Sequence, residues 1–333
     1  MHGMNYLLLK IHKNMIQEDA TTQKTKIVVY FNSRIGVDTM RDYEAIALAR
    51  EGRVRIYICC STGVVEEARK RFDLWPTSAA ALGRTLSVGS LMGSMLKSDQ
   101  EQITININGH GPIGTVMVNA YHDGHVRGFV SEPHTMLQYH NGHLAVGMAV
   151  GTDGYLEVTK DLHMKENWKG TVALQSGEIG DDFAYYFTAS EQTPSAVSVG
   201  VLVNPDNSIQ SAGALIIQLM PDAQEEDITY VEHVISNLKH MSELILEHDN
   251  LEDIVTSLFP DANILTTQDI HYRCDCDKSK MKRALTTLPK EERLKMIDED
   301  HGCEVTCNFC NEHYHFDEEE LKELERFIDT HAK

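Results

Sequence analysis

The chain has 333 residues, of which 42% are hydrophobic, and its formal net charge is -20. These values predict a folded protein with a sizeable core and at least two domains. No hydrophobic run approaches the length of a transmembrane helix, and Leu7 to Leu9 is too short for a secretory signal. The odd number of cysteines, 7, does not fit a secreted disulfide scaffold and favours a reducing cytoplasm.

The negative charge is concentrated near the C-terminus. Residues 221–333 carry a net charge of -16, and residues 1–220 carry the remaining -4. An acidic surface is poorly suited to the phosphate backbone of nucleic acids. We therefore do not expect nucleic acid among the partners. A membrane is not expected either, because no apolar run reaches transmembrane length.

Residues 1–39 show no clear period apart from a strand-like run at 27–31. We expect them to be an N-terminal extension with little structure, because chain ends are often unordered unless they are tied down. A folded domain is predicted to start at Met40 and to extend to residue 220.

The first part of this domain contains regular elements in close succession. A first element is expected at 44–49, followed by a turn at 51–52. Periodicity and turn residues predict strands at 54–60, 103–107, 116–120 and 126–130, and helices at 64–72 and from 76 to about 97. Cys59 and Cys60 end one strand, so their side chains should face opposite ways as half-buried thiols. The longer helix carries a strip of small residues, which predicts close packing in a soluble core. That strip consists of Ala79, Gly83, Ser87, Ser90 and Ser94.

The segment Gly109 to Gly114 has the glycine spacing of a dinucleotide-binding loop. That function requires a helix after the glycines, whereas a strand is predicted here, so the motif is excluded. His110, His122 and His125 lie in or beside predicted turns and are expected to be solvated.

The remainder of the domain is predicted to alternate between strands and one helix. Two strands are expected within 144–160 around a turn at 152–154, followed by strands at 172–175, 196–203 and 213–219. A helix is expected after Ser176, with aromatic residues on one face. Ser195 has no histidine and aspartate context, so a hydrolase is not favoured.

Residues 221–270 are predicted to form a helical, acidic linker. Apolar residues recur at helical spacing from Ile228 to Ile245, and a second helix is expected at 251–258. Residues 222–270 hold 12 acidic residues and 1 basic residue, so the helices should depend on docking for stability. The alternative is an ordinary pair of surface helices.

Four cysteines form two short pairs near the C-terminus: Cys274 with Cys276, and Cys307 with Cys310, separated by 30 residues. Such pairs are typical of a tetrahedral four-sulfur zinc site, and unliganded core thiols are the alternative. Four thiolates leave no open position for catalysis, so a zinc enzyme is not expected. The nearby residues that could replace or disturb a ligand are His301, His313, His315 and Cys303.

Together these features predict an α+β protein. Residues 40–220 should form an N-terminal β-sheet domain with packed helices, and residues 221–270 the helical acidic linker. Residues 271–333 should form a small C-terminal zinc-binding α/β module.

From Met40 to the C-terminus, the chain resembles the redox-regulated 33-kilodalton heat-shock chaperone family. The two cysteine pairs are the most specific match. The other matching segments are 61–69, 77–96, 109–114, 126–128, 176–179 and 190–195. Residues 1–39 lie outside the resemblance, and Cys59, Cys60 and Cys303 are not part of the four-cysteine pattern.

The resemblance implies a cytoplasmic, ATP-independent holdase and not an enzyme. In the reduced state, one zinc ion per chain would be held by Cys274, Cys276, Cys307 and Cys310. Oxidation would form the disulfides Cys274–Cys276 and Cys307–Cys310, release zinc and unfold the linker. The activated homodimer would then bind unfolded client proteins. The alternative is a structural zinc module of an interaction or nucleic-acid-binding protein without redox switching. Such a module would be expected to have a basic face or stacking aromatics, and this region has neither.

Overall fold

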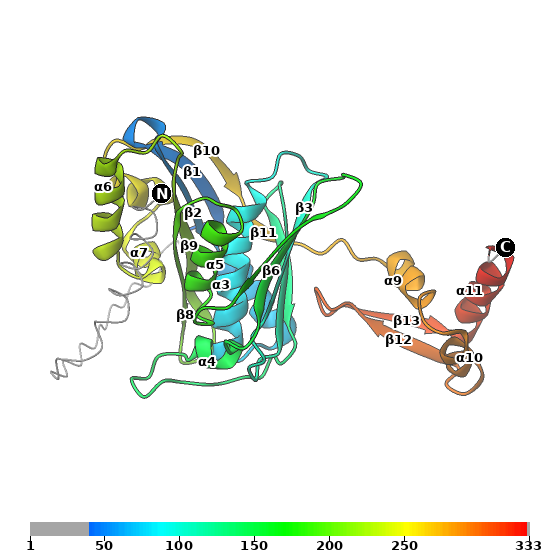
Figure 1. The fold of residues 1–333 in the computed structure, drawn as a ribbon. Coiled ribbons are helices and arrows are strands. Elements are labelled where there is room, and N and C mark those ends of the chain that lie inside the picture. The colour runs from blue at the N-terminus through cyan, green and yellow to red at the C-terminus, as the bar shows by residue number, and fades with distance from the viewer. Residues whose placement is uncertain (1–39, 332–333) are drawn as a thin grey trace.

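The computed structural model describes residues 40–331. Two β-sheets enclose a layer of helices, as Figure 1 shows. The strands of the first sheet are β1 (Tyr43–Ala49), β2 (Val54–Cys60), β8 (Ser195–Val203), β9 (Ile209–Leu219) and β10 (Asn263–Asp269). Their order across the sheet is β10-β1-β2-β9-β8, and all neighbours are antiparallel.

The second sheet has the order β11-β5-β4-β3-β6-β7. Its strands are β3 (Gln102–Asn108), β4 (Thr115–Tyr121), β5 (His125–Val130), β6 (Tyr155–Asp161), β7 (Trp168–Ala173) and β11 (His271–Tyr272). Only β11 runs parallel to its neighbour, β5; the other pairs described here are antiparallel. The helices of this domain are α2 (Thr62–Phe72), α3 (Pro76–Gly93), α4 (Val146–Val150) and α5 (Gly180–Ala189), and a short turn, η2 (Arg50–Gly52), joins β1 to β2.

Helix α3 lies between the two sheets and is buried along almost its whole length. The small residues make this possible, because a Cβ atom on Gly89 would lie 2.9 Å from Val118 of β4. On Gly83 it would lie 2.6 Å from Val65 of α2. The small-residue strip therefore serves soluble core packing, as predicted. No helix within residues 40–331 is both long and apolar enough to cross a bilayer.

Strand β2 has a hydrophobic core on each side. Cys59 faces the inner core around α3, and Cys60 faces an outer core between the first sheet and the linker helices. The two thiols point in opposite directions, as predicted, but both are fully buried rather than half-buried.

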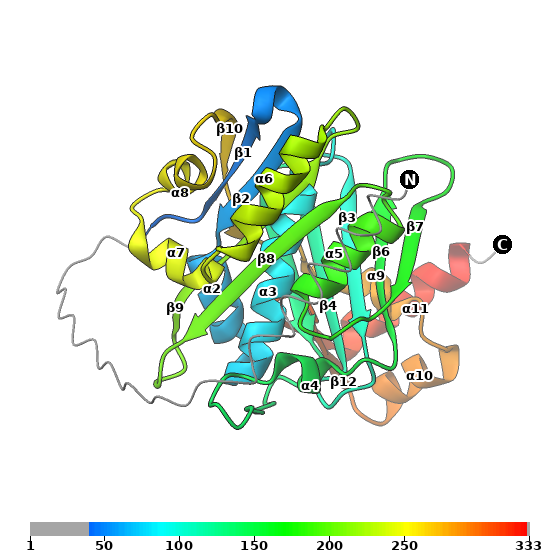
Figure 2. The same ribbon diagram turned by 60° about the vertical axis from the view of Figure 1, so that its left-hand side comes forward.

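The predicted linker segment begins with three short helices, α6 (Glu225–Ser236), α7 (Met241–Glu247) and α8 (Leu251–Leu258). They cover the outer face of the first sheet, as the turned view in Figure 2 shows. Their apolar residues, Val231, Met241, Leu244 and Ile254 among them, and Phe259 directly after α8 are buried against this sheet. The segment then continues as β10, which pairs with β1 along the sheet edge.

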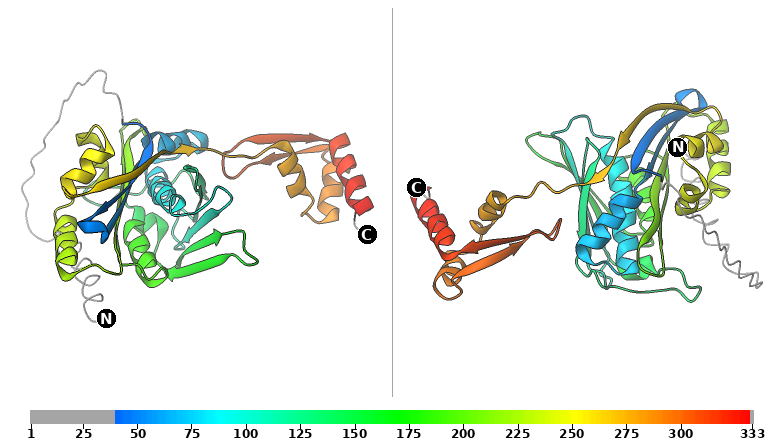
Figure 3. Two further views of the ribbon diagram at one scale, coloured as in Figure 1. Left: turned by 90° about the horizontal axis from the view of Figure 1, so that it is seen from above. Right: turned by 180° about the vertical axis from the view of Figure 1, so that it is seen from behind.

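The C-terminal module has a separate small core. Its elements are α9 (Lys278–Leu285), α10 (Lys290–Asp298), β12 (Gly302–Thr306), β13 (His313–Asp317) and α11 (Glu318–His331). Strands β12 and β13 form a hairpin, and Phe316 of β13 packs with Leu285, Ile297, Leu321 and Leu324 of the three helices. The module extends away from the two-sheet domain, with the hairpin tip pointing toward that domain (Figure 3).

Two predicted elements, one in the two-sheet domain and one in the linker segment, were wrong. Residues 144–160 do not form two strands, because the run before Gly151 is the short buried helix α4 and only β6 follows. A run of five apolar residues does not distinguish a strand from a buried helix. The helix expected from Ile228 to Ile245 is broken after Asn237, and the chain resumes as α7. Helix α7 packs on β9, where a Cβ atom on Gly213 would lie 2.4 Å from Ile245.

The predicted strand near Val172 is found earlier, as β7, and no helix follows Gly109 to Gly114, as expected. The strand-like run at 27–31 and the proposed extension 1–39 lie outside the described residues.

Candidate metal centre

The four cysteines of the two pairs meet at the hairpin tip of the C-terminal module. Cys274 and Cys276 lie on the extended segment between β11 and α9, and Cys307 and Cys310 lie in the turn between β12 and β13. One sulfur from each of the four residues lies within 4.8 Å of all the others. The Cys307 and Cys310 side chains are buried, whereas Cys274 and Cys276 are half-buried.

The spacing of the sulfur atoms fits a tetrahedral zinc ion. With Zn–S bonds of about 2.3 Å, the edges of such a tetrahedron are about 3.8 Å. The Cys274 and Cys307 sulfurs are 3.8 Å apart, and those of Cys276 and Cys310 are 3.2 Å apart. The sulfurs that belong to different pairs are therefore neighbours, so a single ion could join both segments.

Backbone hydrogen bonds shape the second pair into a tight turn. The amides of Cys310 and Asn311 both donate to the carbonyl of Cys307, and the Cys307 amide donates to the carbonyl of Glu312. Asn311 has a φ of 60°, which an asparagine tolerates better than most residues. This turn directs both sulfurs of the pair to the same side.

The environment of the thiols favours a bound cation. Burial raises the pKa of Cys307 and of Cys310. Burial also opposes ionisation of Cys276, but hydrogen bonds, led by that with the Tyr314 hydroxyl at 3.1 Å, lower its pKa overall. Four neighbouring thiolates repel one another, so full ionisation of the cluster requires a compensating positive charge.

The cluster also touches the two-sheet domain. The Arg127 guanidinium of β5 lies 3.4 Å from the Cys274 sulfur. The sequence pattern predicted a strand at 126–130 and a family match at 126–128, but it gave no role to Arg127. Tyr314 was missed as well, although it is the second residue of β13 and follows closely after the turn that carries Cys307 and Cys310.

The histidines near the cysteines do not join the cluster. His313 and His315 both contact Glu304, and His301 contacts Glu318, all on the exposed surface of the module. Cys303 lies on β12 opposite Phe316 and packs in the module core. Among the described residues, the cluster consists of the four predicted cysteines.

His125 was expected to be solvated, and this prediction was wrong. Its side chain is 6% exposed, hydrogen bonds to Asp123 and stacks on Tyr121 at 3.8 Å between ring centroids. Gly124 takes a φ of 80° in the turn directly before β5, and the Nε2 atom of the buried His125 lies 3.9 Å from the carboxylate of Asp275, next to Cys274. His110 and His122 are more open to solvent, as expected, although each is hydrogen bonded.

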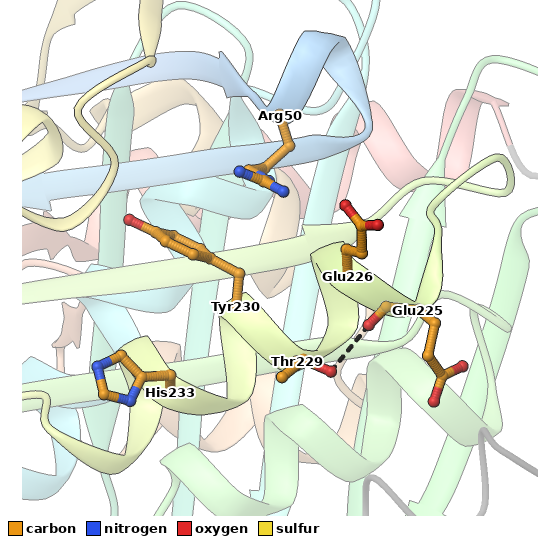
Figure 4. A pocket seen from close by; sticks show the side chains of 6 residues that line it. All are labelled: Arg50, Glu225, Glu226, Thr229, Tyr230 and His233. Atoms are coloured by element: carbon orange, nitrogen blue, oxygen red, sulfur yellow. Dashed lines mark hydrogen bonds between the residues drawn. The ribbon is translucent and has the colours of Figure 1, made fainter.

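Apart from the cysteine cluster, a hollow lies beside the linker helix α6. Figure 4 shows a shallow hollow lined by Arg50, Glu225, Glu226, Thr229, Tyr230 and His233. The Arg50 guanidinium lies 5.0 Å from the Tyr230 ring centroid and is also paired with Asp227. The hollow therefore lies where α6 packs against η2. Among the described residues, it does not bring together a group of metal ligands.

Comparison with known proteins supports these observations. A family model described as Hsp33 protein matches residues 42–317. The chain belongs to the Hsp33 family. It is 46% identical to the 33 kDa chaperonin of Oceanobacillus iheyensis over 290 residues, which cover 86% of this chain and 100% of that protein. The 33 kDa chaperonin of Staphylococcus carnosus is 45% identical over 287 residues, with 85% and 97% covered.

A solved structure of an Hsp33 homologue shows the same fold. The crystal structure of the 33 kDa chaperonin from Thermotoga maritima aligns with a TM-score of 0.82 at 36% identity. The alignment covers 87% of this chain and 99% of that one. The predicted α+β fold class is confirmed. As a member of the Hsp33 family, the chain is a chaperone and not an enzyme, and unfolded proteins are its class of partner.

Proposed function

We propose that this Hsp33 protein is a redox-regulated holdase that binds unfolding proteins without ATP during oxidative stress. In the reduced state it would hold one zinc ion and be inactive. Disulfide formation and zinc release would activate it. The observation that carries this proposal is the position of the cluster: four cysteines from two segments meet where the C-terminal module touches the two-sheet domain.

Cys274, Cys276, Cys307 and Cys310 would hold the ion. When bound, zinc would stabilise the four sulfurs as thiolates and cross-link the two segments of the module. The module buries few large side chains of its own, so the cross-link would supply much of its folding free energy.

The redox step would form one disulfide within each pair. For each pair, two thiolates would lose two electrons to hydrogen peroxide, which takes up two protons from solvent and is reduced to two water molecules. The products would be Cys274–Cys276 and Cys307–Cys310. Disulfide sulfurs are no longer thiolate ligands, so the two segments would lose their common anchor.

The linker would respond because it is held mainly by docking. Residues 222–270 carry 12 acidic side chains and 1 basic side chain, so they repel one another. Their apolar side chains pack on the outer face of the first sheet, which includes Ala45, Ile56, Ile58, Leu215 and Ile217. Opening the linker would expose both apolar surfaces to unfolded clients.

We further propose that the active form is a homodimer and that the protein works in the cytoplasm. Free cysteines in all seven positions fit a reducing compartment at rest.

The test compares the reduced, zinc-loaded protein with the protein treated with peroxide at raised temperature. Light scattering of a thermally unfolding client, without nucleotide, measures holdase activity. Zinc and free thiols are quantified in parallel, and hydrogen exchange reports the protection of α6, α7 and α8. We expect activity and loss of linker protection only after oxidation.

A Cys303→Ser variant is the control and should switch as the wild-type chain does. Equal holdase activity in both redox states would contradict the proposal and favour a structural zinc module. Unchanged protection of the linker in an active oxidised protein would contradict the linker mechanism.

A further inference from the structure

The turn that carries Cys307 and Cys310 also touches the two-sheet domain through the residue between them. The half-buried ring of Phe309 meets the ring of Phe129 on β5 edge to face, with 5.4 Å between centroids. The guanidinium of Arg127, two residues earlier on the same face of β5, lies 4.9 Å from the Phe309 centroid. Phe309 is therefore enclosed by two side chains of the second sheet.

Arg127 contacts both segments that carry the cysteine pairs. It is 3.4 Å from the Cys274 sulfur of the first pair, and it stacks on the ring of Phe309, which lies between the two cysteines of the second pair. On the sheet side it donates to the Tyr121 hydroxyl at 2.8 Å. The Nε atom of Arg127 is buried without a hydrogen-bond partner, so this side chain is held by the few contacts just named.

Tyr272 of β11 fixes the backbone of the same turn. Its hydroxyl lies 2.5 Å from the carbonyl oxygen of Phe309 and 2.9 Å from that of Gly128 on β5, so one proton is shared between the module and the sheet. The Gly128 amide donates back to the same hydroxyl at 3.3 Å.

A second set of contacts comes from α2. The Asn311 side chain donates to the carbonyl of Arg71 at 3.0 Å, and the Arg71 guanidinium reaches the carbonyl of Cys310 at 3.5 Å. Apart from the contact of Arg127 with Cys274, the contacts that link the two-sheet domain to the module here involve the turn between β12 and β13, and none of them involves α10 or α11. The module is thus docked by its metal-binding turn.

We propose that Arg127 and Phe309 are positioning residues that form a latch between the cysteine cluster and the second sheet. The inference rests on the proposed function and adds a second path by which oxidation of the cysteines would affect the two-sheet domain. The two-sheet domain would sense the state of the thiols directly at β5, in addition to any effect through the linker.

The latch depends on the reduced cluster for two reasons. Phe309 is covalently placed between Cys307 and Cys310, so a disulfide between them would reshape the turn that presents its ring. The Cys274 sulfur is the anionic partner of Arg127 only as a thiolate, and oxidation would remove that negative charge. Both contacts would weaken in the same event, and the module would leave β5.

Two variants test the latch: Arg127→Met, which keeps length but removes charge, and Phe309→Ala. Both should keep one zinc ion and four reactive thiols per cluster in the reduced state. Hydrogen exchange of the β5 and β11 amides should be about tenfold faster, the size expected for one partly desolvated cation–π contact. Arg127→Lys should be intermediate, because it keeps the charge near Cys274 but loses the planar stacking.

Functionally, the reduced variants should already show part of the holdase activity of the oxidised protein. Phe327→Ala is the matched control, because Phe327 lies on α11 of the same module and is 57% exposed. It should behave as the wild-type chain does in every measurement. In the double variant Arg127→Met with Phe309→Ala, the loss of protection, expressed as a free energy, should be smaller than the sum of the losses in the two single variants. The reason is that the two residues share one contact.

Wild-type protection of β5 in both single variants would overturn the latch. Loss of zinc in both variants would also overturn it, because the contacts would then serve metal binding instead of docking. These outcomes differ from failure of the proposed function, which would appear in the wild-type chain as equal activity before and after oxidation. The exchange measurement decides the latch even in that case.

Discussion

Asp227, at the start of α6, is fully buried and lies 2.7 Å from the Nε atom of Arg53, just before β2. Arg50 of η2 contacts the other oxygen of the same carboxylate at 2.9 Å. The carboxylate also accepts a hydrogen bond from the Gln224 amide and so caps the helix. This one side chain therefore joins the first linker helix to the hairpin between β1 and β2.

Replacing Asp227 by Asn should loosen α6 on the first sheet. The amide keeps the shape of the carboxylate but loses its charge, which the two arginines require. We expect hydrogen exchange in α6 to be about tenfold faster, the effect of weakening a charge-assisted hydrogen bond. Asp222→Asn, at an exposed position before the helix, is the control and should change nothing.

The same carboxylate predicts a loss of linker stability in acid. The hydrogen bond from Arg53 holds the pKa of Asp227 well below its usual range. Its contribution is therefore complete above the unfolded pKa of about 4 and is lost as the pH falls below that value. Asp227→Asn should remove this part of the acid sensitivity, which urea unfolding at several acidic pH values would measure.

Glu44 of β1 predicts the opposite dependence. Its side chain is 1% exposed and accepts hydrogen bonds from Ser90 and Gln268, and burial raises its pKa to about 8. The folded protein thus holds the proton to a higher pH than the unfolded chain does. Stability should fall as the pH rises from about 5 to 9, by on the order of a few kcal/mol, and Glu44→Gln should flatten this slope. Denaturant unfolding across that range, with Glu225→Gln as the exposed control, measures the difference.

Replacing a cysteine outside the cluster and replacing one inside it should have different effects on the zinc content of the protein. Cys303 lies four residues before Cys307 on an extended strand, or about 13 Å along it. Cys303→Ser should retain one zinc per chain, whereas Cys307→Ser should lose it. X-ray absorption should show four sulfur ligands, and a histidine nitrogen in the coordination shell would contradict the assignment.

Tyr314→Phe should weaken metal binding without abolishing it. The hydroxyl lies 3.1 Å from the Cys276 sulfur, and outer partners of this kind orient ligands. We expect zinc affinity to fall by about 10- to 100-fold in a competition titration with a chelator. Tyr185→Phe, at an exposed position of α5, should leave the affinity unchanged.

A chain that begins at Met40 should be as stable and as active as the full chain. Residues 1–39 lie outside the family match, which begins at residue 42. Thermal unfolding and the light-scattering assay would compare the two chains. A clear drop in melting temperature on removal of residues 1–39 would show that the extension packs on the domain.

Local patterns predicted much of the fold where one physical signal dominated. The alternation at Ile103 to Ile107 predicted β3, and the capping residue Asn250 together with Pro260 gave the bounds of α8 as 251–258. In other segments, tertiary packing determined which secondary structure formed. Residues 263–269 were assigned to the linker, yet they form β10, because the partner that makes them a strand is β1, more than two hundred residues earlier.

The candidate metal site also has one part that the sequence predicts and one part that it does not. The four cysteines could be identified from their spacing, because a metal needs several ligands in a short stretch of chain. The residues that surround them could not. Arg127 is 147 residues from Cys274 in sequence, and nothing in the pattern of β5 distinguishes it from an ordinary solvent-facing arginine.

Strand β10 has one more consequence. It occupies the outer edge of the first sheet, paired with β1 from Tyr43 to Leu48. If this strand leaves with the rest of the linker, β1 becomes an edge strand with a row of unpaired amide and carbonyl groups. Such an edge accepts any extended backbone by strand addition, whatever its side chains. A chaperone that must bind many unrelated sequences would then have, beside its apolar surfaces, a template that is indifferent to sequence.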